Sequence, residues 1–336
     1  MGQREITPVS STVSCSHPAI STPTSSAASG LGFRHEALLY AGGDAGFLQG
    51  TVGLVADAVE DDAAVLIAVA PPRAQALREA LGDYAGRVTF AAMHELGRNP
   101  ARIIAIWDSF LEEHGGEHSL AIGEPAWPGR SPAELSECER HESLLNVAFE
   151  SGPSWHLLCP YDLDGLDDRV IEAARRTHPI LARNGRSRIS ERYPGPHREP
   201  RPFSGDLPAP SAPYVALAFT VKQLAEIRHD VCEWATQQSL GLEESEELVL
   251  AVNELTTNSV RHGGGRGVLR MWREGETLLC EVQDEGQITL PLVGRRRPEP
   301  EALSGRGVWI ANQLCDLVQI RSAPAYTVVR VHKALA

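Results

Sequence analysis

The sequence predicts α/β and α+β folds in one chain: a three-layer α/β domain at residues 31–189 and, at residues 213–336, helices on one face of a mixed sheet. Three observations support this. Strand-like and helix-like segments alternate through the first region, which is typical of a mostly parallel sheet with helices on both faces. Residues 190–212 are dense in proline and charge and predict a semi-extended linker. Beyond the linker, long helical segments precede hairpin patterns.

The first region follows a tail at residues 1–30 that is rich in Ser, Thr, Pro and Ala, and that we expect to be disordered. Residues 63–70 form a continuous apolar run, as expected of a strand buried on both faces. Pro71 and Pro72 come next, and proline suits the first turn of a helix. Helices are expected at residues 45–60, 71–81, 101–114, 134–150 and 167–177, and further strands at 88–91, 119–123 and 155–160.

The second region opens with a strand pattern at residues 214–220, followed by helices at 221–238 and 242–261. A hairpin is expected at residues 268–273 and 277–284. A loop rich in Arg, Pro and Glu leads to a helix at 306–315 and a final hairpin at 317–322 and 326–332. This order predicts helices packed on one face of a sheet.

The formal net charge of −13 disfavours a general nucleic-acid binder, because such a protein needs a basic surface to displace counterions. The N-terminus lacks the pattern of a signal peptide, and no stretch supplies the about 18 consecutive apolar residues of a membrane span. We therefore expect a cytoplasmic protein that binds small molecules or proteins, and neither nucleic acid nor membrane. The six cysteines show no CxxC pair and no zinc-ligand spacing, which indicates scattered buried thiols.

Glu254 and Asn258 lie four residues apart on the helix expected at residues 242–261, so they share one face of it. An amide oxygen can coordinate Mg²⁺, which accepts oxygen ligands. A carboxylate one turn away can accept a proton from a nucleophile or orient a water. Because such a pair is more often a solvated helix face, the spacing alone does not establish a site.

Two glycine-containing motifs add support. Asp284 ends an expected strand before Glu285 and Gly286, where a carboxylate can accept a hydrogen bond from adenine and glycine lets the backbone approach the base. Gly305 and Gly307 open the last expected helix, where backbone N–H groups attract phosphate. Each motif alone is weak, since a turn after a strand is common. The chain has no GxxxxGKS or GxxxxGKT pattern, so the sequence excludes a P-loop.

In this order, the segments NELTTNSVRHG, QDEG and SGRGVWIANQLCD resemble the N box and the two glycine boxes of the GHKL ATPase superfamily. The resemblance spans residues 213–336 and is greatest to the RsbW-like anti-sigma-factor serine kinases. It implies a Bergerat-type sandwich that binds ATP and Mg²⁺. It also implies residue roles: Glu254 as general base, Asn258 as Mg²⁺ ligand, Asp284 and Gly286 at adenine, Gly305, Arg306 and Gly307 at the phosphates, and Arg261 on the same edge as His262, which is more often a helix-end residue.

The chemistry of that family is phosphoryl transfer from ATP to a serine of a STAS-type anti-sigma factor antagonist. The resemblance therefore implies a protein-serine kinase that also binds a sigma factor. Two alternatives stay open: a non-catalytic ATP-binding module that sequesters its partner, and an atypical histidine-kinase-like signalling protein. The proline-rich linker disfavours the latter because it stands where such kinases carry a helical hairpin, and His141 is interpreted as a structural helix residue. Whether the chain forms a homodimer also stays open.

The first region resembles the MEDS sensory domain of regulators of the dichloromethane-response type. The likeness rests on FRHEALLY at residues 33–40, RNPARII at 98–104, GEPAWPGR at 123–130 and CERHESLLN at 138–146. It implies a RecA-like core that senses a small molecule, although the turn after residues 63–70 lacks the glycine and lysine of a phosphate site. Five side chains are candidates for a ligand pocket, or alternatively tie loops together: His35, Arg98, Glu124, Trp127 and Arg130.

Overall fold

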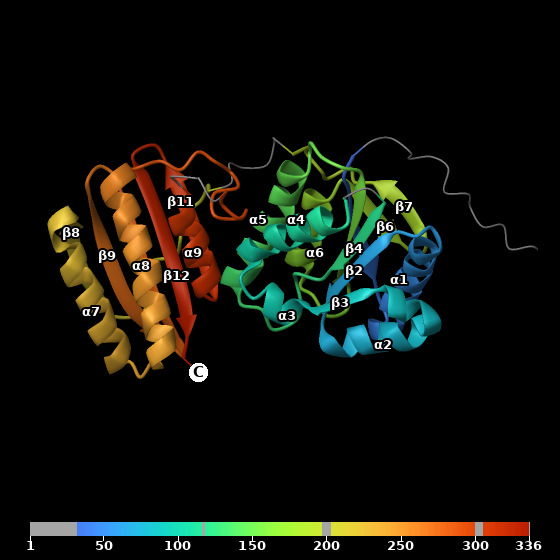
Figure 1. Cartoon of the computed structure of the whole chain (residues 1–336), viewed down its shortest axis with the longest axis horizontal. Helices are drawn as coiled ribbons and strands as arrows, with labels where there is room; N and C mark the ends of the chain where they lie inside the picture. Colours follow the sequence, from blue (N-terminus) through green and yellow to red (C-terminus); the bar gives the residue numbers. More distant parts are fainter. Residues whose placement is uncertain (1–31, 116–117, 197–202, 300–304, 336) are drawn as a thin grey trace, which may run out of the picture. The chain divides into compact units, whose positions relative to one another are not determined.

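The structure is a computed structural model that describes residues 32–115, 118–196, 203–299 and 305–335. In these segments the chain forms two sheets, of seven and five strands, each with its own helices (Figure 1). Gly32–Ala336 is one compact unit. The tail predicted at residues 1–30 lies outside the described residues.

The first sheet has the strand order β3-β2-β4-β5-β1-β6-β7. The first six strands of the chain pair in parallel, and β7 runs antiparallel to β6. Parallel neighbours need a crossover connection, which explains the alternation of strands and helices along the sequence. The strands are β1 (Arg34–Tyr40), β2 (Ala64–Val69), β3 (Thr89–Ala92), β4 (Ser119–Gly123), β5 (Trp155–Asp162), β6 (Ile180–Arg183) and β7 (Arg186–Ile189).

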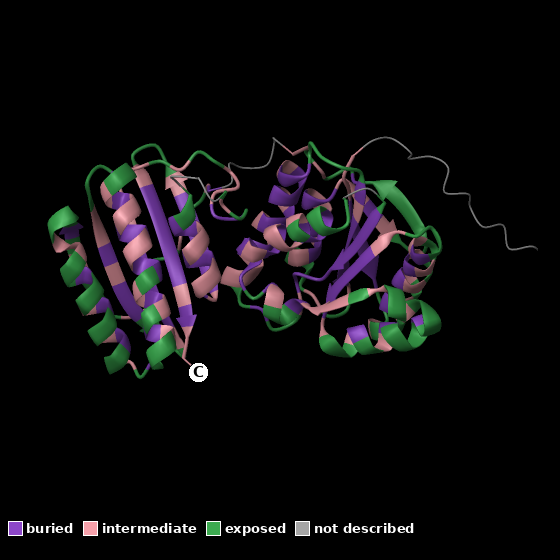
Figure 2. Cartoon of the chain, in the orientation of Figure 1, coloured by how far each residue is buried: buried purple, intermediate pink, exposed green. Residues whose placement is uncertain are grey.

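Helices cover both faces of this sheet. Successive strand residues point to opposite faces, so Leu38 and Ile67 pack against α1 and α2, whereas Leu39 and Ala68 pack with α4, α5 and α6. The predicted three-layer α/β fold is therefore confirmed, and Figure 2 shows its central strands buried. The helices are α1 (Gly43–Glu60), α2 (Pro71–Leu81), α3 (Met93–Leu96), α4 (Ile103–Glu113), α5 (Pro132–Ala148) and α6 (Asp168–Thr177), with the 3₁₀ turns η1 (Gly82–Arg87) and η2 (Pro100–Arg102).

Three strands of the first sheet, β1, β6 and β7, were not predicted from the sequence. Strand β1 opens with Arg34, His35 and Glu36, of which the last two are buried, and these polar residues hide the apolar run that a buried strand normally shows. Strands β6 and β7 are four residues each and form a short hairpin at the sheet edge. Short, charged edge strands give little periodicity to detect.

The second sheet has the order β11-β12-β10-β9-β8, and its neighbouring strands all pair antiparallel. The combination of α/β and α+β folds is confirmed. The second sheet is antiparallel throughout, which corrects the prediction of a mixed sheet at residues 213–336. The elements are β8 (Val215–Thr220), η3 (Val221–Gln223), α7 (Leu224–Gln237), α8 (Leu242–His262), β9 (Arg266–Glu274), β10 (Thr277–Asp284), α9 (Arg306–Leu314), β11 (Leu317–Ala323) and β12 (Tyr326–Ala334).

The two faces of the second sheet differ in chemistry. One face packs its apolar side chains, such as Leu269 and Val331, with those of α7, α8 and α9. On the other face Glu281 of β10 lies directly opposite Arg330 of β12 and Arg270 of β9. Its carboxylate accepts from Arg330 Nη2 at 2.6 Å and from Arg270 Nη1 at 2.9 Å. Charged cross-strand pairs replace a second helical layer there, which makes the unit a two-layer sandwich.

Candidate functional site

Helix α8 carries the first group of predicted site residues. Its buried side chains, among them Leu248, Val252 and Leu255, face the core of the sandwich. Glu254 and Asn258 are half-buried and lie one turn apart, as their spacing predicts. Because the apolar face fixes α8 against the core, the side chains of Glu254 and Asn258 are held next to the first turn of α9.

Gly307, in the first turn of α9, lies directly against this pair. A Cβ atom on Gly307 would stand 2.7 Å from Asn258 Nδ2 and 3.0 Å from Glu254 Oε2. Only glycine leaves room for both side chains, so the backbone at the start of α9 approaches them closely. Gly305, the N-cap of α9, has φ of 88°, in the left-handed region that favours glycine. The structure thus brings the second glycine box to the N box.

Asp284, at the end of β10, forms a second cluster beside α8. Its Oδ2 accepts a hydrogen bond from Ser259 Oγ at 2.5 Å, and its Oδ1 accepts one from the Gly286 N–H at 2.8 Å. Gly263 allows this approach, because a Cβ there would stand 2.3 Å from Asp284 Cγ. Each carboxylate oxygen can accept a further bond, so the fixed carboxylate retains capacity for a ligand.

Three hydroxyl residues around Asp284 and Gly286 were missed by the sequence analysis. Besides Ser259, Thr327 Oγ1 of β12 donates to the Gly286 carbonyl at 2.9 Å and lies 2.8 Å from Ser322 Oγ. Ser259 follows Asn258 directly in the first motif, so its position was a usable signal. Thr327 comes from a strand more than forty residues away, and no local pattern marks it.

The remaining predicted residues lie at an exposed rim. Arg261 and His262 end α8 and are exposed, as is Arg306 at the start of α9. Arg306 Nη2 donates to the Glu299 carbonyl at 3.4 Å. The structure therefore assembles Glu254, Asn258 and Gly307 closely, places Asp284 and Gly286 in a neighbouring cluster, and leaves the three cationic or imidazole side chains at the surface.

The five pocket candidates of the first domain do not converge on one site. Glu124 is paired with Arg73, whose Nη2 also lies 3.2 Å from Asp162 Oδ2. Arg130 stacks over the Trp127 ring at 3.5 Å and donates to the carbonyls of residues 97 and 98. Arg98 Nε lies 3.1 Å from Asp316 Oδ1. These four side chains tie loops together, in agreement with the alternative interpretation of the sequence.

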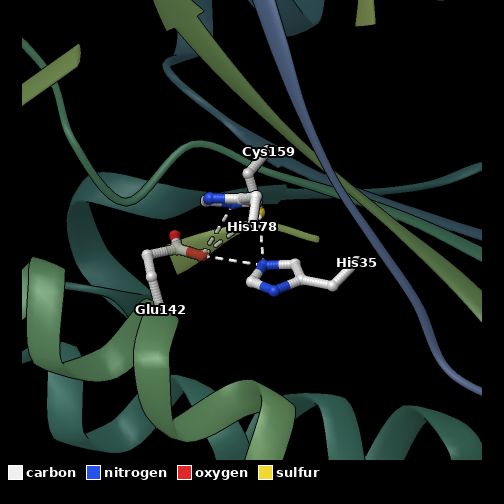
Figure 3. Close-up of side chains that lie close together, drawn as sticks. All are labelled: His35, Glu142, Cys159 and His178. Carbon is white, nitrogen blue, oxygen red and sulfur yellow. Dashed lines mark hydrogen bonds and ion pairs between the residues drawn. The ribbon is translucent and has the colours of Figure 1, made fainter. Parts of the chain in front are cut away.

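His35 belongs to a separate, fully buried group (Figure 3). Its Nε2 lies 2.9 Å from Glu142 Oε2 and 3.6 Å from Cys159 Sγ. His178, just after α6, places its Nε2 3.2 Å from the same carboxylate oxygen. Burial, together with the nearby His178 ring, lowers the pKa of His35 to about 4. Sequence reasoning missed this group, since His178 and Cys159 belong to no recognised motif.

Most of the cysteines, and His141, are buried. Cys138, Cys159, Cys280 and Cys315 are buried free thiols, as predicted, but Cys232 is exposed on α7, which corrects the expectation that the cysteines are buried. Cys15 lies outside the described residues. His141 is 1% exposed within α5, and burial lowers its pKa to about 3. A ring enclosed in this way agrees with a structural residue and gives a phosphoryl donor no access.

Comparison with known proteins assigns both domains. Residues 34–179 match the MEDS family, the MEthanogen/methylotroph, DcmR Sensory domain. Residues 217–333 match the histidine kinase-like ATPase domain family. The chain therefore contains a MEDS sensory domain and a histidine kinase-like ATPase domain of the GHKL type, the combination of a signalling regulator. The curated proteins give no significant match.

Two solved structures show distant likeness. The RsbU and RsbW domains of Rv1364c from Mycobacterium tuberculosis are 17% identical, with a TM-score of 0.29, over 37% of this chain and 32% of that chain. The Acinetobacter baumannii histidine kinase AdeS is 11% identical, with a TM-score of 0.21, over 36% of this chain and 68% of that chain. The chain thus spans about a third of the first of these structures. None of the helices in the described segments has the length and hydropathy needed to cross a bilayer.

Proposed function

We propose that this chain is an anti-sigma-factor regulatory protein whose ATPase domain transfers phosphate from ATP to a serine of an anti-sigma factor antagonist, under control of the MEDS domain. The observation that carries the proposal is the close approach of Gly307 to Glu254 and Asn258. At this approach a helix N-terminus, a carboxylate and an amide side chain come within a few ångströms of one another. These are the groups that phosphoryl transfer requires for phosphate binding, proton acceptance and metal coordination.

The residues present fit ATP and Mg²⁺. In this proposal the Asp284 carboxylate, fixed by Ser259 and the Gly286 N–H, accepts from the adenine amino group. The N–H groups that open α9 bind phosphate oxygens, and the exposed Arg306 neutralises charge at the rim. Asn258 supplies an oxygen to Mg²⁺. When bound, Mg-ATP contributes the phosphoryl group and the charge that polarises it.

Glu254 is the proposed general base. It is half-buried on α8 and faces the first turn of α9, so a serine presented there by a partner would meet the carboxylate and the phosphate-binding N–H groups together. The carboxylate would take the hydroxyl proton as the serine oxygen attacks the γ-phosphorus of ATP, while the bond from that phosphorus to the bridging oxygen breaks and ADP leaves. Positioning and charge stabilisation account for most of the catalysis in phosphoryl transfer, so a rigid pair of helices suits the reaction.

Contacts within Gly32–Ala336 support control by the MEDS domain. Arg102 of η2 donates from Nε to the Asn312 carbonyl at 2.7 Å and from Nη2 to the Cys315 carbonyl at 3.1 Å. Asn99 Nδ2 donates to the same Asn312 carbonyl at 3.1 Å. Carbonyls at a helix C-terminus favour a cation. Two side chains of the sensory domain therefore hold one end of α9, while the opposite end of that helix is the proposed phosphate site.

The test is phosphotransfer. The full chain is incubated with Mg²⁺, γ-labelled ATP and STAS-type antagonist proteins, and label on antagonist serine is measured. We expect acid-stable phosphoserine that disappears in Glu254→Ala and persists in the control Glu246→Ala, which alters an exposed glutamate on the same helix. ATP and sigma-factor binding without transfer would favour the sequestering module instead. Acid-labile label on His141 would favour a histidine-kinase-like protein.

A further inference from the structure

The buried group in the MEDS domain joins four separate elements. His35 comes from β1, Glu142 from α5, Cys159 from β5 and His178 from the residue that ends α6. One ligand-type atom from each lies within 4.8 Å of every other (Figure 3). The side chains of His35, Glu142 and His178 are at most 2% exposed, and Cys159 is 1% exposed. These four side chains thus point toward one another in the interior of the domain, where strands β1 and β5 meet helices α5 and α6.

The Nδ1 atom of each histidine ring lies within hydrogen-bond distance of an oxygen acceptor. His35 Nδ1 lies 3.1 Å from Asn146 Oδ1, and the Asn146 amide is oriented because its Nδ2 donates to the carbonyls of Glu142 and Thr177. His178 Nδ1 lies 2.8 Å from the Ala174 carbonyl. Since an oxygen acceptor requires a donor, both Nδ1 atoms carry the proton. Both neutral rings therefore direct the bare lone pair of Nε2 at the Glu142 carboxylate.

Adding one proton to the two histidines does not give both Nε2 atoms a favourable contact with the Glu142 carboxylate. Whichever ring takes a second proton, the other directs its Nε2 lone pair at a carboxylate oxygen 3.2 Å away or less. Protonating both would place like charges in rings whose centroids are 4.0 Å apart, inside the protein. Among the described residues, His178 Nε2 and Glu142 Oε1 have no hydrogen-bond partner. When both rings are neutral, the Glu142 carboxylate is paired with no cationic side chain among the described residues.

We propose that His35, Glu142, Cys159 and His178 bind one divalent transition-metal ion, with Zn²⁺ the best fit to this donor set. Zinc bonds of about 2.0–2.3 Å in a tetrahedron put neighbouring ligand atoms about 3.2–3.7 Å apart. Four of the six separations between ligand atoms in the cluster are 2.9, 3.2, 3.6 and 3.6 Å, and all six are within 4.8 Å. Small side-chain shifts complete the tetrahedron.

The net charge of the ligand set, and the hydrogen bonds made by the two histidine Nδ1 atoms, both suit a metal site. A dication with one thiolate, one carboxylate and two neutral imidazoles has no net charge, so it can be buried without a counterion. Nδ1–H bonds to an amide or backbone oxygen are the usual way in which proteins fix metal-binding histidines. Four protein ligands leave no open position, so the ion ties β1, β5, α5 and α6 together in a closed site.

The experiment uses the full chain, stripped of metal with a chelator and titrated with Zn²⁺ and with Co²⁺ as a spectroscopic probe. We expect one equivalent to bind, with visible bands of tetrahedral Co²⁺ and a thiolate-to-cobalt charge-transfer band. Cys159→Ser should abolish the charge-transfer band and weaken Zn²⁺ binding at least about tenfold. Cys138→Ser is the matched control, since Cys138 is also buried in this domain but lies outside the cluster.

Two results would overturn the proposal: no stoichiometric binding by the wild-type chain, or a charge-transfer band that survives in Cys159→Ser. If the serine variant fails to fold, the wild-type chain decides, because bound zinc must raise its Tm progressively as the free zinc concentration exceeds the Kd. ATP binding reports on the other domain and distinguishes loss of this site from failure of the proposed kinase activity.

Discussion

Gly307→Ala tests how the nucleotide site is built. The added methyl group would stand 2.7 Å from Asn258 Nδ2 and 3.0 Å from Glu254 Oε2, closer than side chains tolerate. Alanine is otherwise acceptable at this helical position, because its helix propensity exceeds that of glycine by about 1 kcal/mol. The substitution therefore acts mainly by displacing the two side chains, with a smaller adjustment between the helices because Glu254 Cβ would be 3.3 Å from the new methyl group.

The expected loss of Mg-ATP affinity follows from overpacking. In the free protein, Asn258 and Glu254 can rotate away from the new methyl group, but the proposed ligand site needs both in their original positions. Forcing an extra methyl group into a filled space costs about 1–3 kcal/mol. If the bound state bears this cost, the Kd for Mg-ATP rises about 5- to 150-fold. The Tm should change little, since the folded free protein relaxes.

Isothermal titration calorimetry with Mg-ATP measures the affinity, and differential scanning calorimetry measures the Tm. Gly53→Ala is the matched control, because Gly53 is an exposed helical glycine in α1 with nothing within 4 Å of an added Cβ. It should bind Mg-ATP as the wild type does. The reasoning is refuted if Gly307→Ala binds within about twofold of wild type, or if the control loses as much affinity.

Three other predictions follow. Ser259→Ala removes a hydrogen bond to the Asp284 carboxylate, worth about 1.5–3 kcal/mol, and should weaken ATP binding at least about tenfold in the same titration; unchanged affinity would mean that Asp284 needs no such support. Arg102→Ala should speed amide hydrogen exchange in the last turn of α9, whereas protection equal to wild type would show that its bonds do not hold the helix. Burial lowers the pKa of His332 from 6.5 to about 4. As pH falls through that window the unfolded chain gains a proton that the folded chain refuses, so the wild type should lose up to about 3 kcal/mol relative to His332→Gln in denaturant titrations, and parallel pH profiles would contradict the assignment.

Local patterns were enough to predict most of the secondary structure. Helix α2 begins at Pro71 and ends at Leu81, and β4 spans Ser119–Gly123, both as expected from the sequence. Each of these elements has a periodicity or a proline that acts within a few residues. Strand β1 was missed because its buried polar residues are paired across the fold, which no local window reveals.

The sequence by itself determined the ATPase domain, because its motifs are short segments that each place glycine or a polar group at the end of one element. Only the tertiary structure decided which distant side chains complete the sites. His35 and His178 are separated by most of the first domain, and Arg102 meets α9 from more than two hundred residues away. Burial selects such pairings through the cost of an unpartnered polar group, and that cost depends on the packed interior rather than on neighbours in the chain.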